Sequence, residues 1–269
     1  MRRLCALLEV TRAGYYAWRT RCESARRKQD RHLLEAIRRV FTRSRGTYGS
    51  PRVHRALKRL GWAVSRRRVE RLMRTEGLRG RVARIYRANP GLHKIFAQHP
   101  NRLWKRRATR PDQVWVADVT YLAVGGQWRY LAVVMDQRSR RILGWSLGRG
   151  RGVSLTRGAL DGAVRRRHPR RGLIFHSDRG IEYAGKGMKE RLVALGVRQS
   201  MTRGGCPGDN AYAESFFHSL KADVIHGNRF TNDKQLRSCL RSYIPFYNQE
   251  RTHSSIGYLS PVEYESRVA

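Results

Sequence analysis

"QVWVADVTYLAV", residues 113–124, is the segment on which the fold of this chain depends. Its β-branched and aromatic residues, followed by the turn-forming "GGQ", predict a β-strand. "WRYLAVVMD" and "RILGWSLG" follow after short turns, which predicts an antiparallel meander of three strands. A helix over 153–167, a buried strand over 172–178, a helix over 185–195, the short strand "VRQSM" and a last helix complete the order βββαβαβα. This order predicts an α/β fold with a mixed sheet flanked by helices.

The first 80 residues have an all-helical pattern instead. We predict two helices within residues 2–20, a polar connector over 21–31 and a helix over 32–43. In "SPRVHRALKRLG", Ser50 is suited to cap a helix and the proline to begin it, and Ser65 can cap the next one. Two short helices joined by a tight turn predict a helix-turn-helix.

The charge of the chain indicates a polyanionic partner. The formal net charge is +37, and residues 1–110 carry 32 Lys and Arg against 6 Asp and Glu. A GC-rich genome explains arginine in place of lysine, but it does not explain the scarcity of acids, so DNA is the expected partner. The alternative is a small helical bundle with a solvated basic face. The candidate DNA contacts in this region are Arg52, Arg66, Arg67, Arg68 and Arg71.

The composition argues against a membrane or secreted protein. No apolar run approaches the roughly 20 residues that a membrane helix needs, and "MRRLCALLEV" is interrupted by Glu9, so we interpret it as an amphipathic helix rather than a signal peptide. The four cysteines are scattered and form no CxxC pair. They therefore indicate neither a zinc ribbon nor a disulfide framework, and a cytoplasmic location is expected.

Three carboxylates stand in apolar surroundings. Asp118 lies in the middle of the first strand of the meander, Asp178 ends the fourth strand, and Glu214 lies in the first turn of the last helix if Asn210 caps that helix. An ionised carboxylate in an apolar strand is costly unless it is paired or binds a metal. We expect the first and fourth strands to be neighbours, which would bring the two aspartates together. The alternative is that each aspartate caps a turn or pairs with an arginine.

The helix that carries Glu214 has a docking face and a polar strip. Glu214, His218 and Lys221 share one strip at helical spacing. The apolar face beside it consists of Ala213, Phe216, Phe217 and Leu220. Clustered carboxylates need cations, and ligation by oxygen alone selects Mg²⁺ or Mn²⁺. Two such ions about 3.5–4 Å apart can activate an attacking oxygen and stabilise a leaving oxygen at phosphorus.

These residues lie in motifs that resemble a known family. "WVADVTYL", "HSDRGIEY" and "DNAYAESFFHSLK", with 35 residues between the last two carboxylates, resemble the motifs of insertion-sequence transposases with a retroviral-integrase-type core. More narrowly, the chain is similar to the second-frame protein of the insertion sequence three family. "GTYGSPRVHRAL" and "YNQERTHSSIGYLSPVEY" (247–264) support this, and the resemblance spans about residues 30 to 265.

The resemblance implies a ribonuclease-H-like fold and a mechanism. Asp118, Asp178 and Glu214 would hold two Mg²⁺ ions, with Mn²⁺ as a substitute, and no nucleotide cofactor is expected. The protein would nick the ends of its element and then transfer the freed 3′-hydroxyl to another phosphodiester. Lys221 matches a basic residue that contacts DNA near the site. His176 and Asn210 accompany the motifs, where they either support the carboxylates or only pack.

The resemblance also bears on partners and on alternative functions. In this family the first-frame protein usually supplies a further end-binding domain and a leucine zipper, so a first-frame partner or fusion and a multimer on nucleoid DNA are expected. A DNA-binding regulator on an inactive core and a nuclease that cuts without joining are the alternatives, and a basic ribosomal-type protein is a more distant one. The expected domains are an N-terminal helical segment (1–28), a helix-turn-helix domain (29–80), a linker (81–110), the catalytic core (111–225) and a C-terminal helical extension (226–269).

Overall fold

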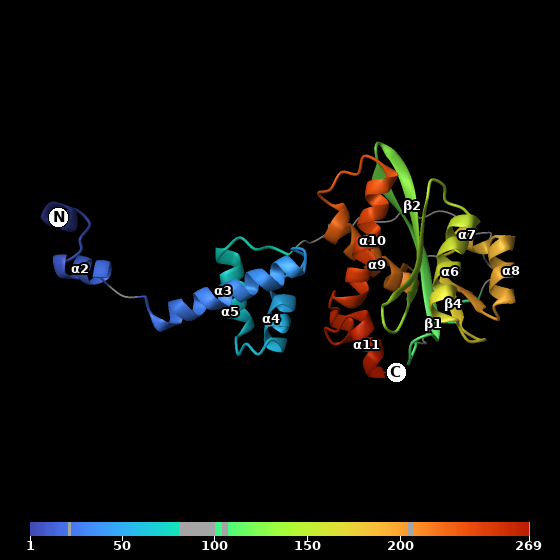
Figure 1. The fold of residues 1–269 in the computed structure, drawn as a ribbon, viewed down its shortest axis with the longest axis horizontal. Helices are drawn as coiled ribbons and strands as arrows, with labels where there is room; N and C mark the ends of the chain where they lie inside the picture. The colour runs from blue at the N-terminus through green and yellow to red at the C-terminus, as the bar shows by residue number, and fades with distance from the viewer. Residues whose placement is uncertain (21–22, 81–99, 104–106, 204–206, 269) are drawn as a thin grey trace. The chain divides into compact units, whose positions relative to one another are not determined.

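The computed structural model describes residues 1–20, 23–80, 100–103, 107–203 and 207–268 (Figure 1). The chain forms two compact units, the first made of Met1–Arg43 with Tyr48–Arg79 and the second of Ser44–Thr47 with Gly80–Ala269. Most of the predicted linker falls outside the described residues, and the boundaries of the five predicted domains stay predictions. Among helices in the described ranges, none is both long enough and apolar enough to cross a membrane.

The first unit is all-helical, as predicted. Thr11 Oγ1 accepts a hydrogen bond from the Gly14 amide at 3.0 Å and so caps the second helix. Apolar side chains of the third, fourth and fifth helices form one core, which includes Ile37, Val53 and Val69. The helices are α1 (Arg2–Leu7), α2 (Arg12–Thr20), α3 (Ala25–Arg43), α4 (Ser50–Arg59) and α5 (Arg66–Thr75).

Two details of these helices differ from the prediction. The polar connector predicted over 21–31 is wrong for most of its length, because α3 already begins at Ala25; Ser24 Oγ accepts from the Arg27 amide at 3.3 Å. This first part of α3 has no apolar face, so periodicity could not reveal it. Gly49 rather than Ser50 is the cap of α4, whereas Ser65 caps α5 as predicted, by accepting from the Arg68 amide.

The second unit contains a five-stranded mixed sheet in the order β3-β2-β1-β4-β5. The pairs β1–β2 and β2–β3 are antiparallel, and β4 and β5 continue the sheet in parallel on the other side of β1. The predicted meander and the central place of the first and fourth strands are thus confirmed. The strands are β1 (Val114–Val124), β2 (Gln127–Asp136), β3 (Ile142–Gly148), β4 (Ile174–Ser177) and β5 (Arg198–Met201).

Helices cover both faces of this sheet (Figure 1). Val116 of β1 packs in a core with Phe216 on one face, while its neighbour Trp115 packs with Leu160 on the other, because successive strand residues point to opposite faces. The first face is covered by α9 (Ala211–Leu220) and α10 (Asp233–Gln249), and the second by α6 (Val153–Arg167) and α8 (Lys186–Ala194). This arrangement is the ribonuclease-H-like α/β fold that the sequence predicted. The remaining elements are α7 (Ile181–Ala184), η1 (Pro207–Asn210), η2 (Lys221–Ile225), η3 (Ser254–Ile256) and α11 (Pro261–Val268).

The segment around Asp178 differs most from the prediction. Strand β4 ends at Ser177, so Asp178 follows the strand instead of ending it. The helix α7 was not predicted, because four residues are too few to show a helical period. Asp178 therefore lies in the turn between β4 and α7, where its carboxylate accepts from the Gly180 amide at 3.1 Å.

The contact between α6 and the sheet depends on Gly144 of β3. A β-carbon at this position would lie 2.0 Å from the Ala159 carbonyl oxygen and 2.5 Å from the Ala163 amide nitrogen. We expect Gly144→Ala to lower the free energy of unfolding by roughly 3 kcal/mol, at the upper end of overpacking costs, because backbone rather than a flexible side chain has to move. Gly150→Ala, which meets nothing within 4 Å, is the control. If the two variants have equal urea midpoints, the packing of α6 on β3 does not require a glycine at position 144.

Candidate active site

Asp118, in the middle of β1, and Asp178, just after the end of β4, lie beside each other on neighbouring central strands. Strands β1 and β4 are parallel, and Val116 pairs with His176 and Ala117 with Ser177. The next residue of each chain segment is the aspartate, so the two carboxylates follow adjacent, paired positions. The fold thus brings together two residues that are separated by two further strands and a helix in the chain.

Glu214 reaches the site from the first turn of α9. This helix buries Phe216, Phe217 and Leu220 against the sheet, and Glu214 stays exposed beside that docked face, as predicted. The prediction for Asn210 needs a correction. Asn210 occupies the cap position of α9, but its side chain accepts no capping hydrogen bond. Its amide nitrogen donates instead to the Ala117 carbonyl at 3.3 Å, which attaches the start of α9 to the strand next to Asp118.

The three carboxylates act on one another electrostatically. Burial and the charge of Asp178 raise the pKa of Asp118 well above its usual range, and Glu214 adds to this. Partial burial and then the charge of Asp178 also raise the pKa of Glu214, and burial raises that of Asp178. Each shift has the sign expected for like charges gathered in a poorly solvated place. The charged forms of these three carboxyls are therefore unfavourable together unless a cation compensates them.

The donor set at this place suits a hard divalent cation. Asp118, Asp178 and Glu214 offer only carboxylate oxygens, and the side-chain oxygen of Asn210 is buried without a hydrogen-bond partner among the described residues. As they stand, no three Asp, Glu, His or Cys side chains of the described segments surround one point closely enough to hold a metal ion. A divalent cation bound there would offset the repulsion among these carboxylates.

His176 lies in β4, two residues before Asp178. Its Nδ1 lies 2.9 Å from Ser200 Oγ of β5, and its Nε2 lies 3.1 Å from the Asp209 carbonyl oxygen. Burial lowers the pKa of His176 to about 4, so the ring is neutral near pH 7. The histidine thus connects β4 and β5 to the turn that precedes α9.

Lys221 lies at the far end of α9, where the π-helical turn η2 begins. Its ammonium nitrogen is 5.1 Å from the centre of the Tyr121 ring, on the same strand as Asp118. Burial lowers the pKa of Lys221, and the charge of Asp118 opposes that shift. The lysine is therefore held within electrostatic reach of the carboxylates, on a strip shared with Glu214.

Sequence reasoning missed three residues at this site. The Arg151 side chain donates from Nε to Glu182 Oε1 at 2.7 Å, and its Nη2 lies 3.7 Å from Asp178 Oδ2. Tyr183 is buried beside the carboxylates, and its hydroxyl has no partner among the described residues. Glu182 is one of few acids in the chain and follows Asp178 within "HSDRGIEY", a signal that could have identified it.

The arginines predicted to contact DNA differ in their surroundings. Arg66 and Arg67, at the start of α5, are exposed and have no ion-pair partner among the residues described. Arg68 and Arg71 both pair with the Asp30 carboxylate, at 2.7 and 2.6 Å. Arg52 lies over the Tyr48 ring at 5.7 Å. The first turn of α5 thus offers the guanidinium groups of Arg66 and Arg67 to a partner.

Comparisons with known proteins agree with this architecture. Family models for an integrase core domain match residues 108–207 and 195–261, and an HTH-like domain model matches residues 28–86. Among solved structures, the magnesium complex of the HTLV-2 integrase catalytic core domain covers 59% of this chain and 99% of its own, with 16% identity and a TM-score of 0.45. A chain of the simian T-cell lymphotropic virus intasome covers 76% of this chain and 67% of its own length, with 13% identity and a TM-score of 0.49.

The fold and the matched integrase core define an enzyme of the polynucleotidyl transferase class, with an HTH-like domain before its core. The InsF transposase of insertion sequence IS3A from Escherichia coli K12 is 37% identical over 275 residues, covering 98% of this chain and 93% of the relative. The 31 kDa protein of insertion element IS600 from Shigella sonnei is 36% identical over 266 residues, covering 98% of both chains. The chain belongs to the IS3 family of transposases.

Proposed function

We propose that this transposase cleaves DNA at the ends of its insertion sequence and joins the freed 3′-hydroxyl to a target phosphodiester, using Asp118, Asp178 and Glu214. The observation that carries the proposal is the parallel register of β1 and β4. It places the two aspartates after paired residues, beside the helix that carries Glu214, in a chain of this family. The exposed side of the site is open to a DNA backbone, which the net charge of +37 attracts.

The three carboxylates would hold two Mg²⁺ ions, and Mn²⁺ would substitute. Bound there, the ions would supply Lewis-acid stabilisation of the charge that develops at phosphorus and would activate the attacking oxygen. The protein's own contribution is to hold the carboxylates on rigid elements, since Asp118 lies in a central strand and Glu214 on a docked helix. His176 and Asn210 position the turn and helix around them, and Lys221 supplies a fixed positive charge for a DNA phosphate.

The test is incubation of the purified chain with DNA that carries the element's ends, with and without Mg²⁺. Both nicked and joined products are read on a denaturing gel. Mg²⁺-dependent nicks together with joined strands are the expected result. Nicks without joined strands would identify a nuclease of the same fold, and DNA binding without either product would identify a regulator on an inactive core.

The first unit would bind DNA through the start of α5. We expect Arg66→Ala with Arg67→Ala to reduce the slope of log affinity against log salt by about two units, because each lost phosphate contact removes close to one. The control is Arg74→Ala with Arg79→Ala, which removes the same charge from the last turn of α5 and from the exposed segment after it. Arg74 lies roughly 12 Å from Arg66 by the helical rise. If the two double variants have equal slopes of log affinity against log salt, the start of α5 does not contact DNA.

The working form would be a multimer on nucleoid DNA in the bacterial cytoplasm, assisted by a first-frame partner or fusion. The family membership supports this part of the proposal. Size-exclusion chromatography with light scattering, in the presence and absence of end DNA, measures the multimer directly. A monomer bound to DNA that cleaves and joins at the full rate would contradict it.

A further inference from the structure

Arg151 connects two carboxylates at the edge of the site. Its Nε donates to Glu182 Oε1 at 2.7 Å, while its Nη2 lies 3.7 Å from Asp178 Oδ2. The guanidinium of Arg151 therefore lies near two acids. One is Asp178, a proposed metal ligand, and the other is Glu182, which has no role in the proposed mechanism. Arg151 also acts on Asp118, since its charge opposes the rise in the pKa of that carboxyl.

Glu182 is the fixed member of this pair. Its side chain is 1% exposed, against 47% for Arg151. A β-carbon on Gly180 would lie 2.4 Å from Glu182 Oε1, so the carboxylate is folded back against the main chain of its own turn. Its carbonyl oxygen accepts from Thr156 Oγ1 of α6 at 3.2 Å. A carboxylate buried to this degree needs a charged partner, and Arg151 is that partner.

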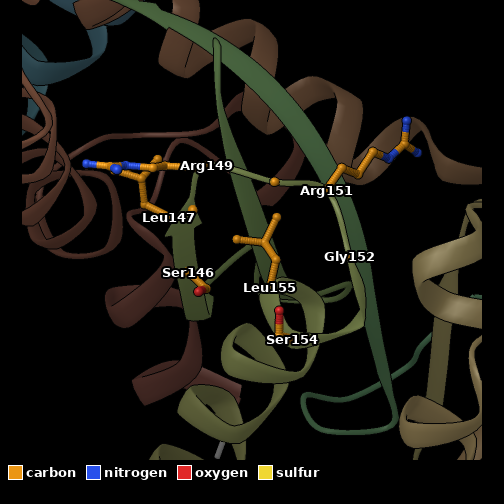
Figure 2. Close-up of a pocket in the computed structure, with 9 residues that line it drawn as sticks. Ser146, Leu147, Arg149, Arg151, Gly152, Ser154 and Leu155 are labelled. Atoms are coloured by element: carbon orange, nitrogen blue, oxygen red, sulfur yellow. The ribbon is translucent and has the colours of Figure 1, made fainter. Parts of the chain in front are cut away.

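Arg151 is by contrast carried on a loop with open space around it. It lies in "GRGRG", residues 148–152, where a β-carbon added to Gly150 or Gly152 would meet no other atom within 4 Å. The loop lines a pocket of about 380 Å³ beside the start of α6. Figure 2 shows Arg149 and Arg151 directed to opposite sides of this loop, so only Arg151 faces the carboxylates.

We propose that Arg151 is a positioning residue that occupies the cation's place beside Asp178 until a divalent ion binds, and that Glu182 holds it ready to be displaced. The inference rests on the proposed function of the three carboxylates. A guanidinium and a divalent ion compete for the same carboxylate oxygens, because both are cations and both need the lone pairs of Asp178. When the guanidinium moves away from Asp178, its hydrogen bond to Glu182 remains. The buried carboxylate of Glu182 therefore keeps its charged partner.

The competition predicts opposite effects for the two partners. We expect Arg151→Gln to tighten Mn²⁺ binding roughly tenfold, since a neighbouring like charge shifts such an equilibrium by a log unit or more. We expect Glu182→Gln to weaken it by a similar factor, because it removes a negative charge and frees Arg151 to pair fully with Asp178. The readout is the electron paramagnetic resonance signal of free Mn²⁺, titrated with the full-length chain in the absence of DNA.

Arg149→Gln is the matched control. It removes the same charge from the same loop, but Arg149 lies 3.6 Å from Asp233 rather than near the site. Its Mn²⁺ affinity should stay within about twofold of wild type, as expected for a screened surface charge. If Arg149→Gln and Arg151→Gln tighten binding equally, or if Glu182→Gln tightens it, the inference is overturned.

Thermal unfolding in EDTA gives an independent readout. Arg151→Gln should unfold at a lower temperature than wild type, and the double variant with Glu182→Gln should recover most of the loss, because it leaves no unpaired buried carboxylate. Should Arg151→Gln not fold, the double variant with Glu182→Gln takes its place and should bind Mn²⁺ more tightly than Glu182→Gln alone, because the competing guanidinium is gone. If Asp118→Asn binds Mn²⁺ as tightly as wild type does, the metal site itself is refuted. A metal site that Arg151 variants do not alter would refute only this inference.

Discussion

Asp118→Asn is expected to reduce Mg²⁺-dependent cleavage and joining at least a thousandfold, while DNA affinity stays within several-fold of wild type. The carboxylate is the central member of the site, and an ion held there would stabilise the charge at phosphorus by several kcal/mol, which corresponds to this factor at about 1.4 kcal/mol per tenfold. DNA binding depends on surfaces that the variant leaves intact, including the start of α5. Rates come from gel assays with end DNA, and affinity from fluorescence anisotropy.

The same variant has a second signature, in stability. Burial, and in addition the charges of Asp178 and Glu214, raise the pKa of Asp118. The charged form of Asp118 is therefore unfavourable in the folded protein. The neutral amide of asparagine removes this repulsion. In EDTA, Asp118→Asn should therefore unfold at a temperature equal to or above that of wild type. Asp161→Asn, at an aspartate of α6 that pairs with Arg191 at 2.7 Å, controls for the amide change. Full cleavage by Asp118→Asn would refute the role of the carboxylate.

Arg251→Met is expected to lower the free energy of unfolding by about 3–5 kcal/mol, the cost of breaking a buried ion pair by removing one partner. Arg251 Nε donates to Asp223 Oδ2 at 2.6 Å, and the Tyr243 hydroxyl donates to the same oxygen at 2.7 Å. The side chains of Arg251 and Asp223 are only 4% and 2% exposed. Urea unfolding followed by tryptophan fluorescence measures the loss.

Two variants show whether the loss comes from breaking this ion pair. Arg241→Met makes the same substitution at an exposed position of α10 and should change the unfolding free energy by less than about 0.5 kcal/mol. Asp223→Leu combined with Arg251→Met removes both charges and should recover much of the stability, as replacement of a buried pair by apolar residues often does. A loss in Arg251→Met no larger than in Arg241→Met would contradict the interpretation.

The position of this pair explains the "YNQERTHSS" motif near the end of the chain. Asp223 lies in η2, two residues after Lys221, and Arg251 follows the end of α10. The pair therefore attaches the turn that carries the lysine to the C-terminal helices.

Local patterns in the sequence determined most of the elements of this protein. Runs of β-branched and aromatic residues separated by short turns predicted β1 to β3, and α6 was predicted to the residue. The three carboxylates were found because acids are rare here and stand in apolar segments. The polar start of α3 and the four-residue α7 were missed because neither has an apolar period to detect.

Only the tertiary structure decided which side chains meet at the site. The side chain of Asn210 has the chemistry of a cap, yet the Ala117 carbonyl of a strand 93 residues earlier takes its hydrogen bond. Arg151 lies in a loop and Glu182, 31 residues later, in the four-residue helix α7, neither of which shows a pattern. The packing of α6 on α7 brings them to Asp178. Secondary structure follows from periods of two to four residues, which a sequence displays. Contacts between side chains far apart in the chain depend on strand pairing and helix docking, which it displays only indirectly.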